Sequence, residues 1–456
     1  MQSNLDFADA HINLGAALAR AGRHDAALES YDRAIALQPG SAHAWSNRGL
    51  VLAGTDRHEA ALENFARALA LEPDLAEAHY NQGKALADSG RPEAALQSYE
   101  RAIAFDPGHA DACYNRAIIL GDLMRHEEAL ESYERAIEVN PGHSGAQLNL
   151  ALCRLILGDF SRGWPAYEWR RLSPDARAAV YAAPAWLGEE TLAGKTILLH
   201  AEQGLGDTLQ FCRYAKQVSA LGAHVVLEVQ KPLKDLLANL EGVDHLIARG
   251  EPIPRVDYQT PLLSLPLAFK TTLDTIPAVP KGFGSAPALI ERWRGRLGPK
   301  SLPRIGLVWK AGTEARSVPL AGMLGLVSGN HQFFALQTEV SAADREILDS
   351  RKDFLHLTAG LRNFADAPLV ELMDLVITAD TSMAHLAGAL GKPVWVLLPF
   401  NPDSRWMLGR PDSPWYPTVR LFRQPAPGDW GSVLGRVSDA LKGEFGTHRR
   451  TGSGLA

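Results

Sequence analysis

The sequence has few cysteines and no long apolar run, and these absences exclude several classes of protein. Its three cysteines, Cys113, Cys153 and Cys212, form no Cys-x-x-Cys pair, so we expect neither a disulfide framework nor a cysteine zinc site. The apolar stretch KPVWVLLPF is too short to cross a bilayer, and the first residues lack the basic start and apolar core of a signal peptide. The net charge of −6 gives no general basic surface for nucleic acid. We therefore expect a cytoplasmic protein without a transmembrane segment or a nucleic-acid partner.

The first third of the sequence repeats itself every 34 residues. Four units follow one another without a gap, over 8–41, 42–75, 76–109 and 110–143. Each unit has a proline two residues before its end, and proline cannot continue a helix. The pattern of small residues, one aromatic and this proline resembles the tetratricopeptide repeat, a helix–turn–helix unit. We predict an α-solenoid over 1–171, in which a fifth, incomplete unit caps the stack.

One polar residue recurs at the sixth position of every unit. The five residues are Asn13, Asn47, Asn81, Asn115 and Asn149. An amide carries donors and an acceptor, so a column of amides can bind an extended peptide backbone. The alternative is that asparagine is simply common at this position and serves the helix or solubility. The column resembles the asparagine ladder of O-linked N-acetylglucosamine transferase, which implies a groove for a protein or peptide acceptor.

Strands and helices alternate over most of the remaining sequence. Nine short apolar runs are expected to be strands, from KTILLH to KPVWVLLP, and the stretch over 207–223 is expected to be one amphipathic helix. A linker is expected over 172–194, followed by Rossmann-like lobes over 195–298 and 299–443 and a disordered tail over 444–456. Two such lobes form a cleft, where open parallel sheets usually bind their ligands. On this pattern alone the α/β part fits a two-lobed glycosyltransferase, an epimerase or a binding protein.

The stretch DLVITADTSMAHLAGALGKP, over 374–393, carries the strongest motif. A strand is expected to end at Asp380 and a helix to begin with Thr381, Ser382 and Met383, whose N–H groups suit a diphosphate. His385 follows one turn later, on the side of Thr381. The alternative makes Asp380 and Thr381 ordinary N-caps and His385 a buried packing residue.

This stretch resembles the signature of the heptosyltransferase-like glycosyltransferases (family 9). The residues that match are Asp380, Thr381, His385, Ala387, Ala389 and Pro393. The resemblance implies a GT-B fold and a diphosphate site for a nucleotide sugar at this helix. Ser382 departs from the family, which usually has glycine there. Lys310 and Arg316, in GLVWKAGTEARSVPL, match basic residues that neutralise the diphosphate, although they could equally be solvated loop charges.

A second match lies in the first lobe, in the stretch HAEQGLGDTLQF over 200–211. Gly204, Gly206, Asp207 and Leu209 fit the G-x-G-D-x-[IL] turn of the same enzymes. The resemblance implies that Asp207 is the base that deprotonates the acceptor, within an active-site loop of Gln203, Gly204 and Gly206. The alternative is an N-cap aspartate that opens a helix. The chain has no Asp-x-Asp pair, so we expect neither a metal nor another cofactor.

These matches predict a metal-independent, inverting glycosyltransferase. It would use a nucleotide-diphosphate sugar and act on a protein or peptide presented by the repeats. One alternative is a transferase that acts on a glycan or lipopolysaccharide, and another is a non-catalytic scaffold with a degenerate transferase fold. Five further residues could orient the sugar or base, or else pack across the lobes: Arg405, Trp406, Trp415, Tyr416 and Arg420.

Overall fold

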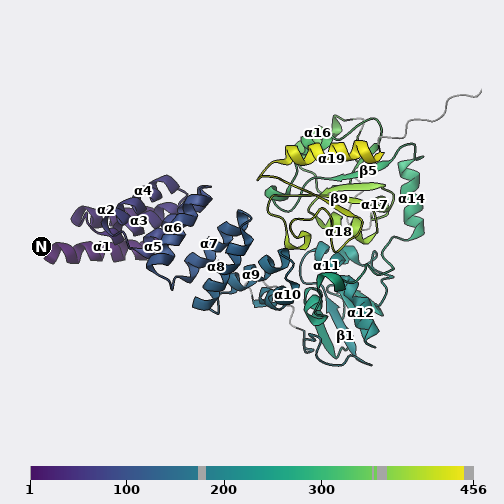
Figure 1. The fold of residues 1–456 in the computed structure, drawn as a ribbon, viewed down its shortest axis with the longest axis horizontal. Helices are drawn as coiled ribbons and strands as arrows, with labels where there is room; N and C mark the ends of the chain where they lie inside the picture. Colours follow the sequence, from purple (N-terminus) through teal and green to yellow (C-terminus); the bar gives the residue numbers. More distant parts are fainter. Residues whose placement is uncertain (1, 173–180, 352–353, 357–366, 446–456) are drawn as a thin grey trace, which may run out of the picture. The chain divides into compact units, whose positions relative to one another are not determined.

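The computed structural model describes residues 2–172, 181–351, 354–356 and 367–445 (Figure 1). The chain forms two compact units, Met1–Arg154 and Leu155–Ala456. We describe each unit by itself. The predicted linker falls partly, and the predicted tail almost entirely, outside the described residues.

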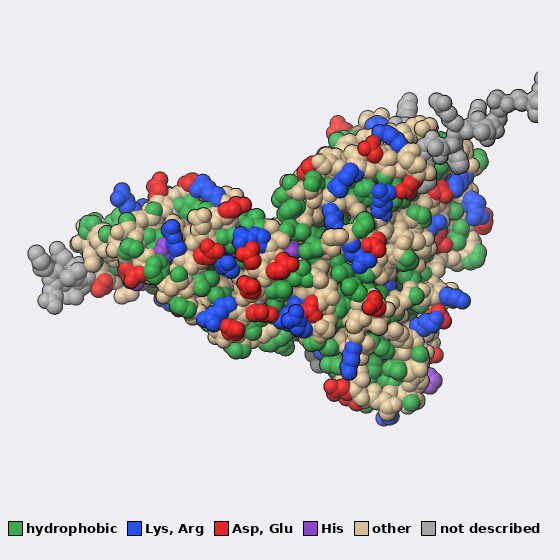
Figure 2. Space-filling view, in the orientation of Figure 1, with side chains coloured by type: hydrophobic (Ala, Val, Ile, Leu, Met, Phe, Trp, Pro, Cys, Tyr) green, Lys and Arg blue, Asp and Glu red, His purple; other side chains and the backbone are tan. Residues whose placement is uncertain are grey.

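The N-terminal unit consists of paired helices, as the 34-residue period predicts. The helices are α1 (Gln2–Arg20), α2 (His24–Leu37), α3 (Ala42–Ala53), α4 (His58–Leu71), α5 (Ala76–Asp88), α6 (Pro92–Phe105), α7 (Ala110–Asp122), α8 (His126–Val139) and α9 (Ser144–Ile156). On the face shown in Figure 2, acidic and basic side chains are interspersed over these helices.

Close packing between paired helices explains the small residues of the repeat pattern. A Cβ atom added to Gly83 of α5 would lie 2.6 Å from the ring of Tyr99 of α6, so a larger residue would require this ring to shift. The same contact recurs as Gly15 with Tyr31 and Gly49 with Phe65. The fourth unit has Ala117 at this position, where it is fully buried.

The C-terminal unit contains two parallel sheets. The first has the strand order β3-β2-β1-β4 and the second β10-β9-β8-β5-β6-β7. The strands of the first sheet are β1 (Thr196–His200), β2 (His224–Val229), β3 (His245–Ala248) and β4 (Tyr258–Pro261). Those of the second are β5 (Arg304–Val308), β6 (Gln332–Ala335), β7 (Phe354–His356), β8 (Leu375–Ala379), β9 (Val394–Leu398) and β10 (Val419–Arg423). The fold is therefore a helical solenoid followed by an α/β part, as predicted, although β10 was not expected as a strand.

Helices and short 3-10 turns connect these strands. In the first lobe they are α11 (Leu205–Phe211), η2 (Cys212–Tyr214), α12 (Ala215–Ala220), η3 (Lys231–Leu233), η4 (Leu262–Ser264), α13 (Leu265–Ala268), η5 (Leu273–Thr275) and α14 (Pro287–Leu297). In the second they are η6 (Glu314–Arg316), α15 (Leu320–Leu324), α16 (Ala342–Asp349), α17 (Ala367–Glu371), α18 (Ser382–Ala389), η9 (Ser404–Trp406) and α19 (Trp430–Phe445). The stretch after Gly206 was expected to form one helix and instead forms α11, η2 and α12. No helix in the described part of the chain is long and apolar enough to cross a membrane.

The segment expected to cap the repeats packs instead within the C-terminal unit. It forms α10 (Phe160–Tyr167) and η1 (Glu168–Leu172). The buried Arg170 of η1 donates to Glu202 Oε1 at 2.8 Å and to Ser264 Oγ at 2.7 Å, and both partners belong to the first lobe. Part of the expected linker is also structured, because Trp186 is buried and its backbone N–H bonds to Gln259 O at 2.9 Å. The lobe therefore begins before residue 195.

Candidate functional site

The two motifs of the C-terminal unit are brought together by helices α11 and α18. α11 follows the central strand β1 of the first sheet, and α18 follows β8, which lies between β5 and β9 in the second. A Cβ atom added to Gly206 of α11 would lie 2.8 Å from His385 Cδ2 of α18. The carboxyl ends of central strands from both sheets therefore meet here, the usual place for a ligand in parallel α/β folds.

The GLGD stretch is the first turn of a helix rather than an open loop. Gly204 is the N-cap of α11, and its N–H donates to Asp207 Oδ2 at 2.9 Å. Asp207 is the third helical residue and is 8% exposed. Gln203 contributes its backbone carbonyl, which accepts from Gln230 Nε2 at 3.0 Å. This capping interaction holds the Asp207 carboxylate in a defined position.

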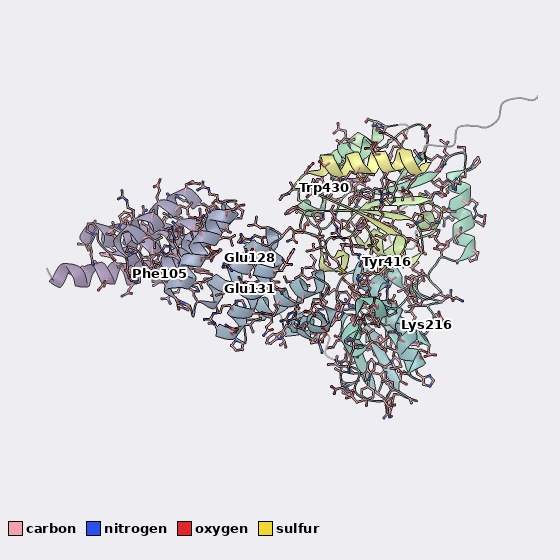
Figure 3. The ribbon with its side chains drawn as sticks, viewed as in Figure 1. Phe105, Glu128, Glu131, Lys216, Tyr416 and Trp430 are labelled. Carbon is pink, nitrogen blue, oxygen red and sulfur yellow. The ribbon has the colours of Figure 1, made fainter. Side chains whose placement is uncertain are left out.

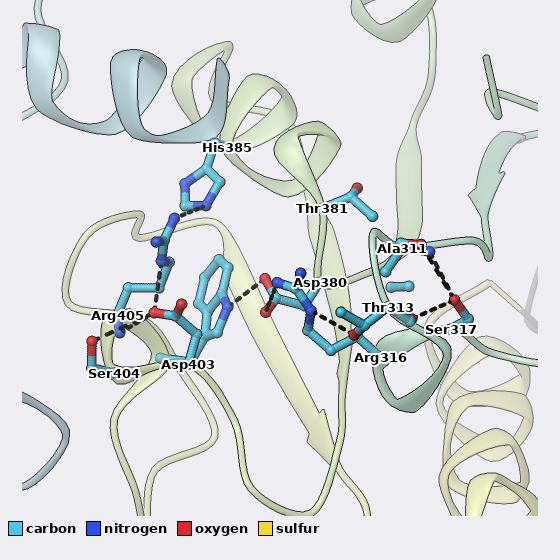
Figure 4. A network of polar contacts seen from close by, with 12 residues as sticks. Ala311, Thr313, Arg316, Ser317, Asp380, Thr381, His385, Asp403, Ser404 and Arg405 are labelled. Atoms are coloured by element: carbon cyan, nitrogen blue, oxygen red, sulfur yellow. Dashed lines mark hydrogen bonds and ion pairs between the residues drawn. The ribbon is translucent and has the colours of Figure 1, made fainter. Parts of the chain in front are cut away.

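Arg405 connects the two lobes at this point, and Figure 4 shows its contacts within the second lobe, with Asp403 and His385. Its Nη2 lies 3.0 Å from Asp207 Oδ1 in the first lobe, and its Nε donates to Asp403 Oδ1 at 2.8 Å in the second. Burial opposes the charge of Arg405, but Asp403 and Asp207 raise its pKa well above the ordinary value. Arg405 is therefore a permanent cation that pairs with one carboxylate from each lobe.

His385 is an interior residue, not a group presented at the helix start. Its ring stacks on Trp406 with centroids 5.3 Å apart, and burial, followed by Arg405, lowers its pKa well below 6.5. Its Nε2 lies 3.3 Å from Arg405 Nη1, and its Nδ1 lies 3.1 Å from Tyr416 Oη. A guanidinium only donates, so Nε2 accepts and Nδ1 carries the proton. The geometry agrees with the alternative that His385 packs the interior.

Asp380 is also buried, behind the first turn of α18. Its Oδ1 accepts from Trp406 Nε1 at 2.8 Å, and burial, followed by Asp403, raises its pKa. Thr381 is the N-cap and accepts from Met383 N at 3.2 Å. Ser382 and Met383 are half-buried. The part of the motif that a ligand can approach is therefore Thr381 to Met383, while Asp380 supports it.

The structure distinguishes the two predicted basic residues. Arg316 Nη1 lies 3.6 Å from Asp380 Oδ2, beside the start of α18. Lys310 pairs instead with Glu314 on its own loop and is half exposed. Of the two, Arg316 is the cation that lies next to the motif.

The asparagine column of the repeats is partly engaged within the protein. The Asn115 amide donates to Tyr80 Oη at 3.2 Å, and Asn149 donates to Tyr114 Oη at 3.3 Å. Asn81 is buried and donates to Glu77 Oε1 at 3.0 Å. Asn13 is exposed and Asn47 is half-buried. At three of the five positions, the asparagine amide therefore donates a hydrogen bond within the repeat unit. This supports part of the alternative, in which the asparagines serve the helices themselves.

The aromatic and basic residues after β9 divide into two groups. Arg405, Trp406, Trp415 and Tyr416 lie around α11 and α18, and Tyr416 is labelled in Figure 3. Arg420 lies away from them on strand β10, where it pairs with Glu444 Oε1 at 2.7 Å. Sequence reasoning missed Arg213, which is 2% exposed and donates to Trp415 O at 2.8 Å. Arginine within an apolar helical stretch was the only signal for it.

Comparison with known proteins supports the repeats directly. Models of the tetratricopeptide repeat match residues 14–81, 76–109 and 110–143. Protein FlbA of Caulobacter vibrioides is 30% identical over 325 residues, which covers 63% of this chain and 53% of FlbA. The chain thus spans about half the length of this curated relative. Because the repeat unit ends at Arg154, a match over 63% of the chain extends into the C-terminal unit.

Several solved structures resemble part of the chain. The crystal structure of MamA is 24% identical and covers 34% of this chain and 91% of its own, with a TM-score of 0.32. YrrB, described as a tetratricopeptide repeat protein with an unusual peptide-binding site, is 23% identical and covers 36% and 86%, with a TM-score of 0.32. PilF of Pseudomonas aeruginosa is 21% identical and covers 37% and 76%, with a TM-score of 0.35.

Proposed function

We propose that the chain is an inverting glycosyltransferase that needs no metal and transfers a sugar from a nucleotide-diphosphate donor to an acceptor hydroxyl. The observation that carries the proposal is the meeting of Asp207 and the start of α18 across the two lobes, at the carboxyl ends of β1 and β8. Tetratricopeptide repeats commonly serve as binding surfaces for proteins or peptides, so we assign the acceptor to this class.

In this mechanism the diphosphate lies against Thr381, Ser382 and Met383, where helix N–H groups and the positive end of the helix dipole favour an anion. Asp207 accepts the proton of the acceptor hydroxyl as its oxygen attacks the anomeric carbon. The bond from that carbon to the diphosphate oxygen breaks, and the nucleoside diphosphate leaves with the electron pair. Arg316, 3.6 Å from Asp380, is the nearby cation that offsets the charge of the leaving group.

The contacts of Asp207 leave it able to act as a base. Its Oδ2 accepts from Gly204 N and its Oδ1 faces Arg405 Nη2. An ionised carboxylate has about four lone-pair positions on its two oxygens, so these contacts leave about half of them for a hydroxyl. The two contacts also fix the orientation of the carboxylate, which general base catalysis requires.

The test is the substitution Asp207→Asn, which keeps the size of the side chain and an oxygen for Gly204 N–H. We expect transfer to fall by roughly 10²- to 10⁴-fold, since a base is lost. Binding of the donor, measured by calorimetry, should stay within about threefold of wild type, since donor contacts lie on α18. Asp235→Asn, at an exposed aspartate of the same lobe, is the matched control and should keep full activity. Full transfer by Asp207→Asn would refute the role of Asp207.

One observation favours a second candidate, a non-catalytic scaffold. Both oxygens of Asp207 already contact the protein, so this carboxylate could serve only to join the lobes. A thermal-shift panel of nucleoside diphosphates and sugar nucleotides separates the two candidates. A ligand that binds the native state raises the melting temperature, and a ligand at 100 times its Kd adds about 2.7 kcal/mol of stability. If no member of the panel shifts the melting temperature, the scaffold is the correct reading.

A further inference from the structure

The segment that leads into the GLGD turn is held in place by side chains from other parts of the first lobe. Residues 201–204, which join strand β1 to α11, form neither helix nor strand. The carbonyls of Gln203 and Gly204 accept from Gln230 Nε2 at 3.0 and 3.4 Å. Asp207 follows this segment by three residues, so the position of its carboxylate depends on how firmly the segment is held.

Arg170 of η1 holds the same segment at its remaining side chain, Glu202. Its Nη2 and Nε donate to Glu202 Oε1 at 2.8 and 3.3 Å, two residues before the N-cap of α11. The same guanidinium donates to Tyr167 O at 3.1 Å, to Glu168 Oε1 at 2.6 Å and to Ser264 Oγ at 2.7 Å. Because the guanidinium is fixed from several directions, the Glu202 carboxylate has one defined position.

The charges around Arg170 are removed from water, which requires an explanation. Arg170 is buried, and the side chains of Glu168 and Glu202 are only 19% and 16% exposed. Burial opposes the charge of Arg170, but Glu202 and Glu168 raise its pKa above the ordinary value. A buried ion pair adds little net stability relative to apolar packing, so stability alone does not explain this cluster.

The Arg170 cluster borders the candidate site through Tyr167 of α10. The Arg170 guanidinium lies over the Tyr167 ring, 4.8 Å from its centroid. Burial raises the pKa of Tyr167 to about 12, while the charge of Arg170 lowers this pKa and the charge of Asp207 raises it. Arg170 and Asp207 are therefore both close to this one phenol.

We propose that Arg170 is a positioning residue for Asp207. It fixes Glu202, Glu202 fixes the segment, and the segment carries the Gly204 N–H that orients the Asp207 carboxylate. The inference rests on the proposed function, because it takes Asp207 to be the base. It gives η1, which follows the repeats in the chain, a part in catalysis without any contact with the substrate.

The first test measures the segment itself, by hydrogen–deuterium exchange of the full chain with detection by mass spectrometry. In Arg170→Gln we expect the peptide over 201–208 to exchange at least about threefold faster than in wild type, because local opening frees its amides. The peptide over 394–398, in β9, should exchange as in wild type. Arg171→Gln is the matched control and should change neither peptide, because Arg171 is the next residue of η1 and pairs with Glu168 at 3.4 Å.

Two results of this measurement would overturn the inference. One is a 201–208 peptide in Arg170→Gln that exchanges no faster than in wild type. The other is faster exchange of both peptides, which would show a general loss of stability in the C-terminal unit.

The second test separates turnover from donor binding. Release of nucleoside diphosphate is measured with UDP-glucose, UDP-N-acetylglucosamine, GDP-mannose and ADP-glucose as donors. For a donor that wild type consumes, Arg170→Gln should lower kcat roughly 10- to 100-fold, because a misplaced base is a poor one. The KM for the donor should stay within about twofold, since the proposed donor contacts lie on α18. Arg171→Gln should keep the wild-type kcat, and an unchanged kcat in Arg170→Gln would overturn the inference.

The substitution Glu202→Gln covers the case in which Arg170→Gln folds poorly. It keeps the size of the side chain and an oxygen for Arg170, and it should also lower kcat at constant KM. The double variant should lose no more than Arg170→Gln alone, because both substitutions act through one contact. A double loss equal to the product of the single losses would show that the two residues act separately, against the inference.

The two tests distinguish this inference from the proposed function. If wild type releases no nucleoside diphosphate from any donor, the proposed function fails, and the exchange measurement decides whether Arg170 holds the segment. If wild type and Arg170→Gln consume the donor equally well, the proposed function stands and the inference fails.

Discussion

The closest approach between the lobes makes Gly206→Ala the most informative single substitution. The added Cβ would lie 2.8 Å from His385 Cδ2 and 3.5 Å from Ser382 Cα. His385 cannot yield easily, because it is 2% exposed and its ring stacks on Trp406. Overpacking of this kind costs about 1–3 kcal/mol, and alanine returns up to about 1 kcal/mol of helix propensity. We therefore expect the variant to lose about 1–2 kcal/mol of unfolding free energy.

Urea unfolding followed by tryptophan fluorescence measures this loss of stability in the C-terminal unit, where Gly206 lies. Trp45 alone among the ten tryptophans lies in the repeat unit, so the signal follows the C-terminal unit. Gly435→Ala is the matched control in the same unit, because Gly435 is also helical and an added Cβ there meets no atom within 4 Å. The double variant with His385→Ala should lose less than the sum of the two single losses, since the clash is removed. An unchanged or higher urea midpoint for Gly206→Ala would refute the packing of α11 on α18.

Three further predictions test the site and its surroundings. Trp406→Phe should cost about 1–3 kcal/mol in urea unfolding, because it removes the 2.8 Å hydrogen bond to the buried Asp380; an unaltered midpoint would contradict this bond. Arg316→Gln should weaken nucleoside diphosphate binding about tenfold by calorimetry, whereas Lys310→Gln should change it less than about twofold; equal effects would contradict the position of Arg316. Burial lowers the pKa of His200 to about 4, below the value of about 6.5 expected when unfolded. Its contribution to stability is therefore complete above about pH 6.5 and is lost as the pH falls towards 4. In His200→Gln the urea midpoint should fall less between pH 6.5 and pH 4 than in wild type. An equally steep fall in the variant would refute this assignment.

Local patterns in the sequence were sufficient to predict most helices and strands of the fold. The 34-residue period predicted every helix pair of the repeats, because glycine and aromatic positions such as Gly83 and Tyr99 report direct contacts within one unit. Short apolar runs predicted β1 to β9, whose residues are mostly buried. Strand β10 was not predicted, because it lies at the edge of the sheet and the exposed Arg420 interrupts its apolar pattern. The repeats also end earlier than the predicted boundary at residue 171. The contacts of Arg170 place η1 in the C-terminal unit, and they could not be predicted because they join residues far apart in sequence.

The sequence named some residues of the candidate site but not their contacts. The resemblance to family motifs named Asp207, Asp380 and Thr381, and the structure places all three near the meeting of α11 and α18. The sequence could not show that Arg405 pairs with Asp207, because that ion pair depends on how two separately folded lobes face each other. For the same reason it could not show that the Gln210 amide is buried without a hydrogen-bond partner among the described residues.

The pairing of Arg405 has a consequence for how Asp207 becomes available to a substrate. Arg405 and Asp403 are two residues apart in η9 and its N-cap, joined through Nε and through the Arg405 backbone N–H at 3.0 Å. The ion pair with Asp207, by contrast, crosses between the lobes. A widening between the lobes would therefore lengthen the Arg405–Asp207 pair, whereas the Arg405–Asp403 pair lies within the second lobe. Because Gly204 N–H still holds Oδ2, the carboxylate keeps its orientation while Oδ1 becomes free for a hydroxyl. In the proposed mechanism, Asp207 would then become available as a base without rearrangement of the GLGD turn.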